Sequence, residues 1–326
     1  MRMLAAPDKF RGTLTAVDAA RAIAAGAAAA GWDSGELPLA DGGEGTLDAL
    51  GGANRTTAVA GPLGEAVKAG WRLDEGIAVV EMARASGLEL AGGRESNDPL
   101  RATTRGTGQL IAAALEGGAR RVLVGVGGSA TTDGGLGAVE VLRPYAPLPV
   151  QVCCDVQTRF VDAAAVYGPQ KGATPVQVEE LTHRLRVLGE RYRTEFGIDV
   201  EALPGAGAAG GLAGGLAALG AELAPGFDVV ADAVGFDGAL LRSDVVVTGE
   251  GFVDATSFAG KVVGGVIHRA EAAGVAAFVI AGDGEPDALA RVRGVSLVAR
   301  FGRKRAFDEA AGCVTQAVAA LFAKRP

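Results

Sequence analysis

Hydrophobic and polar positions follow two patterns along this chain, short apolar runs and longer Ala-rich stretches with helical spacing. Residues 3–6 predict a strand, and Thr13 is placed to cap an Ala-rich helix that reaches about residue 30. Residues 36–40 predict a second strand, and a further helix is expected from Thr46. This βαβα order requires a parallel sheet.

The pattern changes after Arg55. Residues 56–60, 66–73 and 77–82 predict short strands that are joined by tight turns containing Gly-Pro, Gly and Asp-Glu-Gly. Such closely connected strands form an antiparallel meander and not a βα repeat. A second domain is therefore expected to begin near this point.

The middle of the chain predicts a helix at residues 107–116, a strand at 121–126 and a long amphipathic helix at 176–196. The apolar face of the long helix is expected to carry Leu181, Leu185 and Leu188, and its solvent face Glu179, Arg186 and Glu190.

The C-terminal third returns to alternating strands and helices. The expected elements are a strand at 244–248, a helix at 262–273, a strand at 276–281, a short helix near Ala288, a strand at 296–299 and a helix ending at Lys324. Both chain ends, residues 1–55 and 228–326, are therefore predicted to build one Rossmann-like α/β domain with a parallel sheet. Residues 56–227 are predicted to form an inserted domain of mixed α/β structure.

Composition and charge narrow the function. Of the 326 residues, 49% are hydrophobic, which is enough to build the cores of two domains. The 51 glycines are about twice the usual share of roughly 7% and indicate many tight turns. The net charge of -7 disfavours binding to a nucleic acid or an anionic membrane, whereas local Arg and Lys side chains can still hold a small anionic substrate.

Cysteine, histidine and the least charged segment also bear on function and location. Cys153, Cys154 and Cys313 lack a CxxC spacing and are expected to be core residues of a reduced, cytoplasmic protein. With only two histidines in the chain, a multi-histidine metal site is excluded and a Ser-His-Asp triad is disfavoured. Residues 203–221 are uncharged but rich in Gly and Ala, which favours a loop entering a helix over a membrane span.

Acidic residues stand inside glycine-rich turns in three places, at residues 41–46, 133–137 and 248–251. Such turns let backbone N–H groups approach an anion while a carboxylate holds a metal or accepts a proton, which is the chemistry of phosphoryl transfer. Asp8 and Asp41 come after the first two predicted strands, and Glu250 after a third of the same kind. Because ligands collect at the carboxyl ends of parallel strands, these acids are expected to line one crevice.

Two common nucleotide-binding motifs fit only in part. Residues 125–130 follow a strand with the spacing of a dinucleotide fingerprint, but no helix follows at once and Asp155 lies too far along to bind a ribose. Gly260-Lys261 resembles the end of a Walker A loop, but Ala255 and Val262 replace its first Gly and its Ser or Thr. A nicotinamide-dependent hydroxy-acid dehydrogenase and a non-catalytic small-anion-binding protein remain as alternative functions.

Seven segments carry motifs that can be compared with known families: PDKFRGTL at 7–14, ADGGEGT at 40–46, DPLRAT at 98–103, GGSATTDGG at 127–135, GPQKGA at 168–173, GAGAAGG at 205–211 and TGEG at 248–251. Together, and in this order over nearly the whole chain, they resemble the bacterial glycerate kinases of the type that makes 2-phosphoglycerate. The chain departs from that family at Phe252, where an Arg is usual, at Ala255-Thr256, where Gly-Gln or similar is usual, and in a shorter segment after residues 141–142.

The resemblance implies a kinase that uses ATP, Mg²⁺ and D-glycerate, with two α/β domains and an active site in the cleft between them. Phosphoryl transfer requires a base for the hydroxyl proton, groups that hold the transition-state charge, and a metal ion. Asp41 is the favoured base, and Asp8 is the alternative. The candidates to hold charge are Lys9, Lys171 and Lys261, those to face phosphate are Gly127, Gly128, Ser129, Gly207, Gly210, Gly211, Thr248 and Gly249, and those to bind metal are Glu250, Asp155 and Asp254.

The substrate carboxylate is expected to be held by Arg101, with Thr103 beside it, because the planar guanidinium matches a carboxylate in two hydrogen bonds. Lys9 and Arg11 in the first loop are the alternatives. The residues alone leave open which hydroxyl of glycerate is phosphorylated and whether the chain forms a homo-oligomer.

Overall fold

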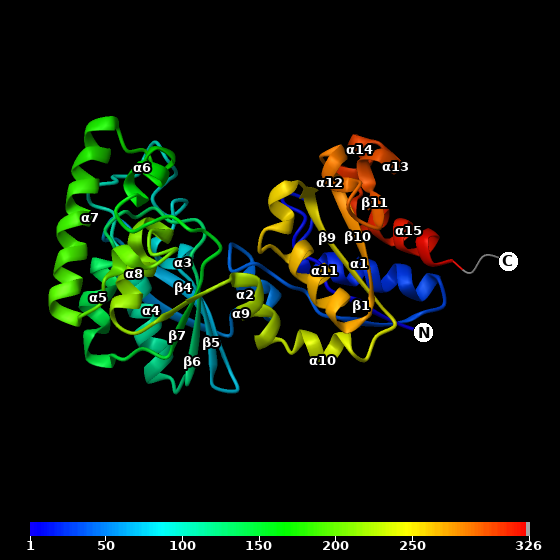
Figure 1. Cartoon of the computed structure of the whole chain (residues 1–326), viewed down its shortest axis with the longest axis horizontal. Coiled ribbons are helices and arrows are strands. Elements are labelled where there is room, and N and C mark those ends of the chain that lie inside the picture. Colours follow the sequence, from blue (N-terminus) through cyan, green and yellow to red (C-terminus); the bar gives the residue numbers. More distant parts are fainter. Residues whose placement is uncertain (324–326) are drawn as a thin grey trace. The chain divides into compact units, whose positions relative to one another are not determined.

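The computed structural model describes residues 1–323, so the predicted helix end at Lys324 lies outside the described residues. The chain forms a mixed α/β structure with two sheets (Figure 1) and divides into two compact units. The terminal unit comprises Met1–Asp41, Asp48–Gly51 and the chain from Phe227 onward, and the central unit comprises Gly42–Leu47 and Gly52–Gly226. Whether the chain folds as two domains with limits near residues 55 and 228 stays a prediction.

The terminal unit is built on a five-stranded sheet in the order β11-β10-β9-β1-β2, with every pair parallel. Its strands are β1 (Arg2–Ala5), β2 (Asp33–Glu36), β9 (Val245–Val253), β10 (Ala276–Gly284) and β11 (Gly294–Ser296). Its helices are α1 (Ala16–Ala29), α9 (Gly226–Ala233), α10 (Phe236–Leu240), η5 (Ala255–Phe258), α11 (Val262–Ala273), α12 (Pro286–Leu289), α13 (Leu297–Phe301), α14 (Arg303–Asp308) and α15 (Ala310–Phe322), while α2 (Thr46–Ala49) straddles the boundary.

Helices cover both faces of this sheet because its strands are apolar on both sides, as parallel strands require. Along β9, Val245 and Val247 pack into one hydrophobic cluster together with residues of α1 and α15. Val246 points to the opposite face and packs into a second cluster with residues of α9, α10 and α11. The alternation of side chains along one strand therefore sends Thr248 and Glu250 to the face that α11 covers.

The central unit has a six-stranded sheet in the order β3-β4-β5-β6-β7-β8. The strands β3 to β5 pair antiparallel, as the meander predicts, and β5 to β8 pair parallel. The strands are β3 (Arg55–Ala60), β4 (Ala66–Asp74), β5 (Ile77–Glu81), β6 (Arg121–Gly125), β7 (Val150–Cys153) and β8 (Glu222–Ala224). The helices are α3 (Ala83–Ser86), α4 (Arg105–Glu116), α5 (Leu136–Leu142), η1 (Arg143–Tyr145), α6 (Ala163–Tyr167), η2 (Pro169–Lys171), α7 (Pro175–Phe196), η3 (Val200–Ala202), η4 (Ala208–Gly211) and α8 (Leu212–Ala218).

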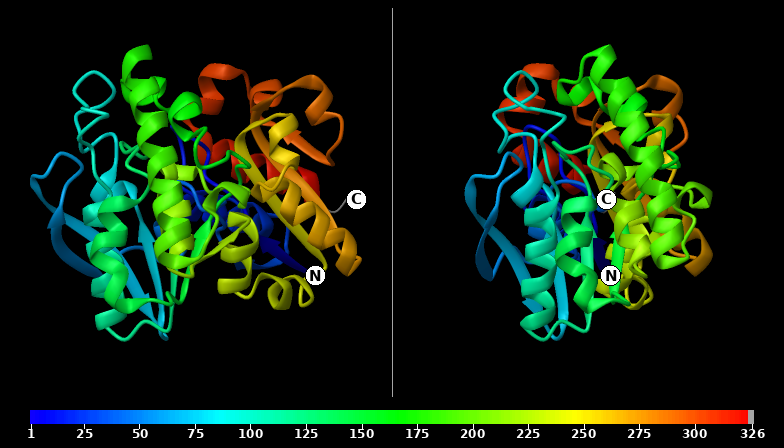
Figure 2. Two further views of the ribbon diagram at one scale, coloured as in Figure 1. Left: turned by 60° about the vertical axis from the view of Figure 1, so that its left-hand side comes forward. Right: turned by 90° about the vertical axis from the view of Figure 1, so that its left-hand side faces the viewer.

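The long helix α7 lies beside α6 in the views of Figures 1 and 2. A capping box between Thr174 and Gln177 starts it, and Gly197 in the left-handed conformation ends it. Its predicted apolar face is confirmed because Leu181, Leu185 and Leu188 are buried. The predicted solvent face is confirmed as well, since Glu179, Arg186 and Glu190 are exposed.

Three local predictions are wrong. Thr15 caps α1, by accepting a hydrogen bond from the Asp18 N–H, whereas the Thr13 hydroxyl donates to the carbonyl of Phe10. The second strand spans Asp33–Glu36 and not residues 36–40, because an edge strand needs no apolar face and these polar residues pair with β1. Most of residues 296–299 are helical, because Ser296 caps α13 with its side chain.

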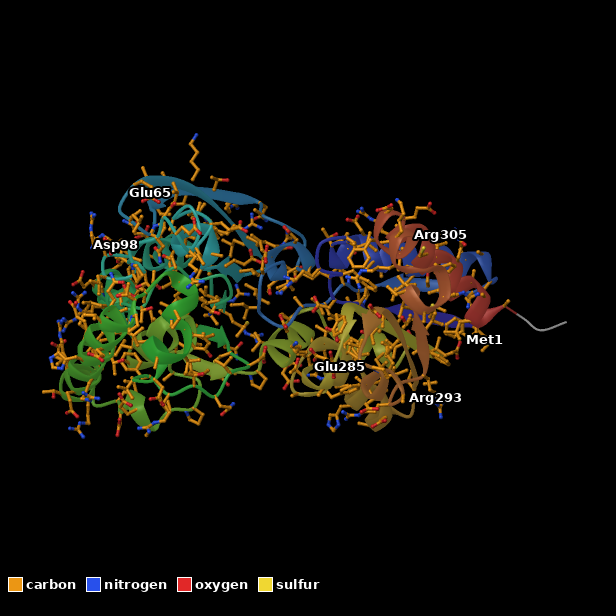
Figure 3. The ribbon with its side chains drawn as sticks, turned by 90° about the horizontal axis from the view of Figure 1, so that it is seen from above. Met1, Glu65, Asp98, Glu285, Arg293 and Arg305 are labelled. Atoms are coloured by element: carbon orange, nitrogen blue, oxygen red, sulfur yellow. The ribbon has the colours of Figure 1, made fainter. Side chains whose placement is uncertain are left out.

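The remaining expectations concern burial and exposure. All three cysteines are buried, and none forms a disulfide within residues 1–323. Residues 203–221 pass through a loop and the short η4 into α8, which confirms the predicted loop and helix, and none of the described helices is long and apolar enough to cross a membrane. Side chains of both signs stand at the surface of the terminal unit, among them Glu285, Arg293 and Arg305 (Figure 3).

Candidate active site

Asp8 stands at the carboxyl end of β1, in the middle of the parallel sheet of the terminal unit. Its N–H donates to the carbonyl of Gly249 in β9 at 2.9 Å. On the other side, the carbonyl of Pro7 accepts from the N–H of Leu39 at 2.9 Å, so the chain that leads to Asp41 continues alongside β1 beyond the end of β2. These contacts hold Asp8 between the strand that carries Glu250 and the segment that carries Asp41.

The structure brings Asp8, Asp41 and Glu250 together at this edge of the sheet. The pKa of Asp8 is raised to about 7, mainly by burial and next by the negative charge of Asp41. The N–H and the charge of Lys9 oppose the rise, and Glu250 adds a smaller one. A carboxyl group with a pKa near neutrality can both accept and return a proton at physiological pH.

Glu250 lies within β9 on the face that α11 covers. Burial raises the pKa of its carboxyl, while a hydrogen bond from Ser257 and the charge of Lys261 lower it. Its Oε1 atom is buried and has no hydrogen-bond partner among the described residues. An unpaired buried carboxylate oxygen is costly, so this atom is suited to a ligand that brings positive charge.

The residues around Glu250 are held by local contacts. Asp254 caps η5, where its Oδ1 accepts hydrogen bonds from the N–H and hydroxyl of Thr256 and from the N–H of Ser257. The Thr256 hydroxyl bond is the main reason why the pKa of Asp254 is lowered. Lys261 donates from Nζ to the Thr256 oxygen at 2.7 Å, and the hydroxyl of Thr248 is buried without a partner in residues 1–323.

The predicted metal ligands belong to different units, with Glu250 and Asp254 in the terminal unit. Asp155 belongs to the central unit, where its carboxylate accepts a hydrogen bond from the N–H of Gly226 at 2.8 Å. Within the described part of the chain, no three His, Cys, Asp or Glu side chains are arranged to hold a metal ion. Mg²⁺ usually takes only one or two protein carboxylates and completes its shell with water and phosphate, so the unpaired oxygen of Glu250 fits such an ion.

The glycines of the central unit allow backbone segments to approach closely. Gly127 and Gly128 follow β6, and a Cβ at Gly127 would lie 3.1 Å from the N atom of Glu44. A Cβ at Gly210 would collide with the carbonyl oxygen of Thr131, and one at Gly207 with that of Arg159. The structure therefore gives these glycines a packing role, and their phosphate-facing role stays a prediction.

The same is true of Gly211 and Gly249. A Cβ at Gly211 would lie 2.7 Å from the Cα atom of Gly134, and the N–H of Gly211 already donates to the carbonyl of Gly207 at 3.2 Å. A Cβ at Gly249 would collide with the carbonyl oxygen of Ile280 in the neighbouring strand β10. Close packing is by itself a sufficient reason for glycine at both positions, and their phosphate-facing role stays a prediction.

Lys171 is buried in the central unit and holds a loop. Its Nζ donates to the carbonyl of Thr131 at 2.6 Å and to the hydroxyl of Ser129 at 3.3 Å. Burial lowers the pKa of Lys171 to about 7, and the charge of Asp133 partly opposes this. The Asn97 amide donates to the carbonyl of Lys171 at 2.8 Å. The ammonium group therefore faces the protein, which favours a positioning role over direct contact with substrate.

A buried acid, Glu81, and a half-buried one, Asp133, organise this unit. The sequence singled out the glycine-rich turn that begins at Asp133 but predicted no particular role for either side chain. Asp133 accepts hydrogen bonds from the N–H and hydroxyl of Thr104, both at 2.8 Å, and from the N–H groups of Gly135 and Gly137. Glu81 accepts through Oε1 from the N–H groups of Gly45 and Leu47, both at 2.9 Å. A single acid directly after an apolar strand was the only signal for Glu81 in the sequence.

The candidates for the substrate carboxylate lie in different units. Lys9 and Arg11 are in the terminal unit, in the loop that follows Asp8. Arg101 is exposed on a loop of the central unit, and nearby Thr103 accepts a hydrogen bond from the N–H of Arg105 at 3.2 Å. The structure thus places Lys9 and Arg11 in the same unit as the three acids.

Comparison with known proteins decides the family. The model of the glycerate kinase family matches residues 3–146 and 141–322. The chain belongs to this family. The two matched stretches meet at the place where the chain is shorter than the resemblance implies. As a member of a kinase family, the protein is an enzyme.

Named relatives support this membership over most of the chain. A glycerate kinase of Halalkalibacterium halodurans is 40% identical over 320 residues, which cover 85% of this chain and 84% of the relative. A glycerate 2-kinase of Escherichia coli K12 is 38% identical over 314 residues, covering 83% and 82%. The crystal structure of a putative glycerate kinase 2 from Salmonella typhimurium LT2 is 32% identical, with a TM-score of 0.83 over 99% of this chain and 97% of that chain. This likeness confirms the predicted α/β fold class.

Proposed function

We propose that the chain transfers the γ-phosphoryl group of ATP to a hydroxyl of D-glycerate and forms 2-phosphoglycerate. Membership of the glycerate kinase family supports the substrate, and the printed name of the Escherichia coli relative, glycerate 2-kinase, supports the position. The three buried cysteines, none of them in a disulfide within the described chain, support a reducing location such as the cytoplasm.

The observation that carries the proposal is the cluster of Asp8, Asp41 and Glu250 with the raised pKa of Asp8. We assign the general base to Asp8 and not to Asp41, which the sequence favoured. A base is most effective when its pKa lies near the working pH, and burial together with the Asp41 charge brings the pKa of Asp8 to about 7. Asp8 would accept the proton of the glycerate hydroxyl as its oxygen attacks phosphorus.

Charged groups of the terminal unit would stabilise the transition state. Glu250 would hold Mg²⁺ through its unpaired Oε1, and bound Mg²⁺ neutralises charge on the phosphates. Lys261 is close enough to lower the pKa of Glu250, so its ammonium group would lie near the transferred phosphoryl group. Lys9 and Arg11, in the loop after Asp8, would bind the carboxylate of glycerate, and Arg101 remains the candidate from the central unit.

Phosphorus NMR of a reaction with ATP, Mg²⁺ and D-glycerate tests the proposal. A phosphate ester on carbon 2 couples to one proton and gives a doublet, whereas an ester on carbon 3 couples to two protons and gives a triplet. The doublet is expected. A triplet would overturn the assigned position, and binding of NADH without any turnover of ATP would overturn the kinase activity in favour of a dehydrogenase.

A further inference from the structure

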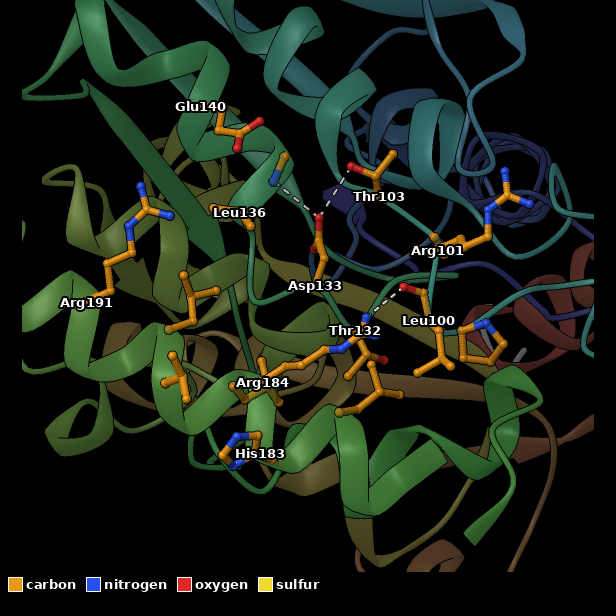
Figure 4. Close-up of a pocket in the computed structure, with 17 residues that line it drawn as sticks. Leu100, Arg101, Thr103, Thr132, Asp133, Leu136, Glu140, His183, Arg184 and Arg191 are labelled. Atoms are coloured by element: carbon orange, nitrogen blue, oxygen red, sulfur yellow. Dashed lines mark hydrogen bonds between the residues drawn. The ribbon is translucent and has the colours of Figure 1, made fainter. Parts of the chain in front are cut away.

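A hollow of ≈ 590 Å³ lies within the central unit, between α5, α7 and the loop around residues 99–103 (Figure 4). Its volume falls in the usual range of small-molecule sites, about 300–1,000 Å³. All of its lining residues belong to the central unit, so the hollow is complete within that unit. Arg101, the central unit's candidate for the glycerate carboxylate, lines it together with Thr103, whereas the acids and lysines of the proposed reaction do not.

Leucine is the commonest residue type in the lining. Leu181, Leu185 and Leu188 come from successive turns of α7, and Leu136 comes from the start of α5. Leu100 contributes from the loop. The three leucines of α7 are buried, so a ligand with a hydrocarbon body would mainly cover the exposed parts of Leu100 and Leu136, which is favourable by about 25 cal/mol per Å² removed from water.

Arginine side chains stand around the leucines, as Figure 4 shows for Arg184, Arg191 and Arg101. Arg184 is tied to the carbonyl of Leu100 through Nη1 at 2.9 Å and to Glu180 through Nη2. Arg191 uses Nε for Glu195, and its two terminal nitrogens have no partner among residues 1–323. Arg191 therefore offers a fork that can bind an anionic group.

The acids in and beside the lining are engaged by other groups. Asp133 is half-buried, and its carboxylate accepts hydrogen bonds from Thr104, Gly135 and Gly137. Glu140 is paired with Arg105 at 3.7 Å, and Glu180 and Glu195 pair with Arg184 and Arg191. The positive group that is left for an anion is therefore the pair of terminal nitrogens of Arg191.

The hollow does not suit the proposed substrate. Glycerate carries polar groups on every carbon and would gain little from a leucine lining. Neither Asp8, Glu250 nor Lys171 lines the hollow. Thr103 does, but its hydroxyl oxygen already accepts a hydrogen bond from the Arg105 N–H.

We propose that this hollow is a second binding site, for a small organic anion with a hydrocarbon body. A medium-chain carboxylate has this chemistry, with its chain against the leucines of α5 and α7 and its carboxylate on the terminal nitrogens of Arg191. Asp133 connects the site to the rest of the unit, because it joins the start of α4 to the glycine turn before α5. Occupancy is therefore expected to stabilise this turn.

Titration calorimetry of the full chain with octanoate tests the proposal, with 1-octanol as the uncharged comparison. Saturable binding of octanoate with a Kd of about 1 mM or below is expected, together with weaker binding of 1-octanol. Val187→Phe would place a ring at the opening from an exposed position and should abolish binding. Val176→Phe is the matched control, because Val176 is exposed on the same helix but does not line the hollow.

Arg191→Gln tests whether Arg191 binds the carboxylate of the ligand. It should weaken octanoate binding about tenfold and leave 1-octanol binding unchanged, since a charge-assisted hydrogen bond is lost. The proposal is overturned if octanoate does not saturate, if Val187→Phe binds it like the wild type, or if ATP or glycerate displaces it. Because these are binding measurements, they are independent of whether the chain phosphorylates glycerate.

Discussion

Asp8 and Lys171 are two partly or fully buried ionisable side chains whose pKa values both lie near 7, although they start from opposite ends of the scale. Burial is the main cause for each, because it disfavours the charged form of either group. Their surroundings differ. Asp8 stands beside other acids at the end of a strand, whereas Lys171 is enclosed by the carbonyl of Thr131 and the hydroxyl of Ser129. Burial therefore moves both pKa values toward 7, and we expect this to serve catalysis at Asp8 and local structure at Lys171.

Replacing Asp8 by Asn should lower kcat by about 10²- to 10⁴-fold, since the general base is lost. Asp41→Asn should retain much more activity but move the acidic limb of the kcat–pH profile to lower pH. The direction follows because Asp41 raises the pKa of Asp8, and the base must be deprotonated to work. Steady-state kinetics between pH 5 and 9 measure both effects, at about two units either side of the pKa near 7. Near wild-type turnover in Asp8→Asn would return the base to Asp41.

Asp8→Asn should also stabilise the fold at neutral pH. The pKa of Asp8 in the folded chain is raised above its ordinary value of 3.8, so its contribution to stability is full below pH 3.8 and is lost as pH rises through 7. Asparagine does not ionise, so Asp8→Asn avoids this loss of stability at high pH. Its Tm at pH 8 is expected to exceed that of the wild type, and the difference should shrink as the pH falls toward 4. A lower Tm at pH 8 would contradict the unfavourable burial of this charge.

Lys171→Met should lower the unfolding free energy by about 1–3 kcal/mol, because Thr131 and Ser129 lose a buried donor. Urea denaturation measures the change. Thr256→Val, which removes an exposed hydroxyl bonded to Lys261, is a control expected to be much milder. Full stability in Lys171→Met combined with lost activity would instead support direct contact of Lys171 with substrate.

At the scale of elements, α7 and α11 were predicted well because their hydrophobic spacing and end signals lie within the helices themselves. The strand β2 was misplaced because its polar residues reveal nothing of their pairing with β1. The clustering of Asp8 and Asp41 could be predicted from the parallel order of strands. The role of Asp133 could not, since its partner Thr104 lies in a different segment and is brought close only by folding.

Glu81 at the end of β5 is expected to fix the glycine loop that follows Asp41. Glu81→Ala would leave the N–H groups of Gly45 and Leu47 without their acceptor, at a cost of about 1–3 kcal/mol for the buried Leu47 group and less for the half-buried Gly45 group. Glu81→Gln keeps an acceptor oxygen and should recover part of the loss. Amide hydrogen exchange at Gly45 and Leu47 should be faster in Glu81→Ala than in Glu81→Gln. Equal exchange in both variants would exclude the proposed anchoring.

At the scale of the whole molecule, the chain passes between the two units several times, and residues 42–47 belong to the central unit although they follow the terminal one in sequence. No pattern in the sequence indicates this, because the contacts that tie this short loop to the central unit, such as those with Glu81, are distant in sequence. The family likeness extends over both units. The two-unit architecture is therefore a property of the family. The assignment of residues 42–47 to the central unit depends on contacts such as that of Glu81 with Gly45.

A fragment of residues 42–226 should be more stable than one of residues 52–226. The shorter fragment lacks the loop whose N–H groups bind Glu81, and it exposes Gly125 and Cys153, against which Gly42 packs. Thermal unfolding followed by circular dichroism compares the two fragments. Equal midpoints would show that residues 42–47 add nothing to the central unit.

The close packing at Gly210 has a genetic consequence. Every missense change of a glycine codon adds at least a Cβ, and at Gly210 that atom would collide with the carbonyl of Thr131 while the backbone keeps a φ of 68°. Gly312, in contrast, lies in α15 with open space around the same position. Among random point mutants selected for activity, missense substitutions should therefore be absent at codon 210 and frequent at codon 312. The number of substitutions that each glycine codon tolerates would then report how closely the backbone is packed at that position.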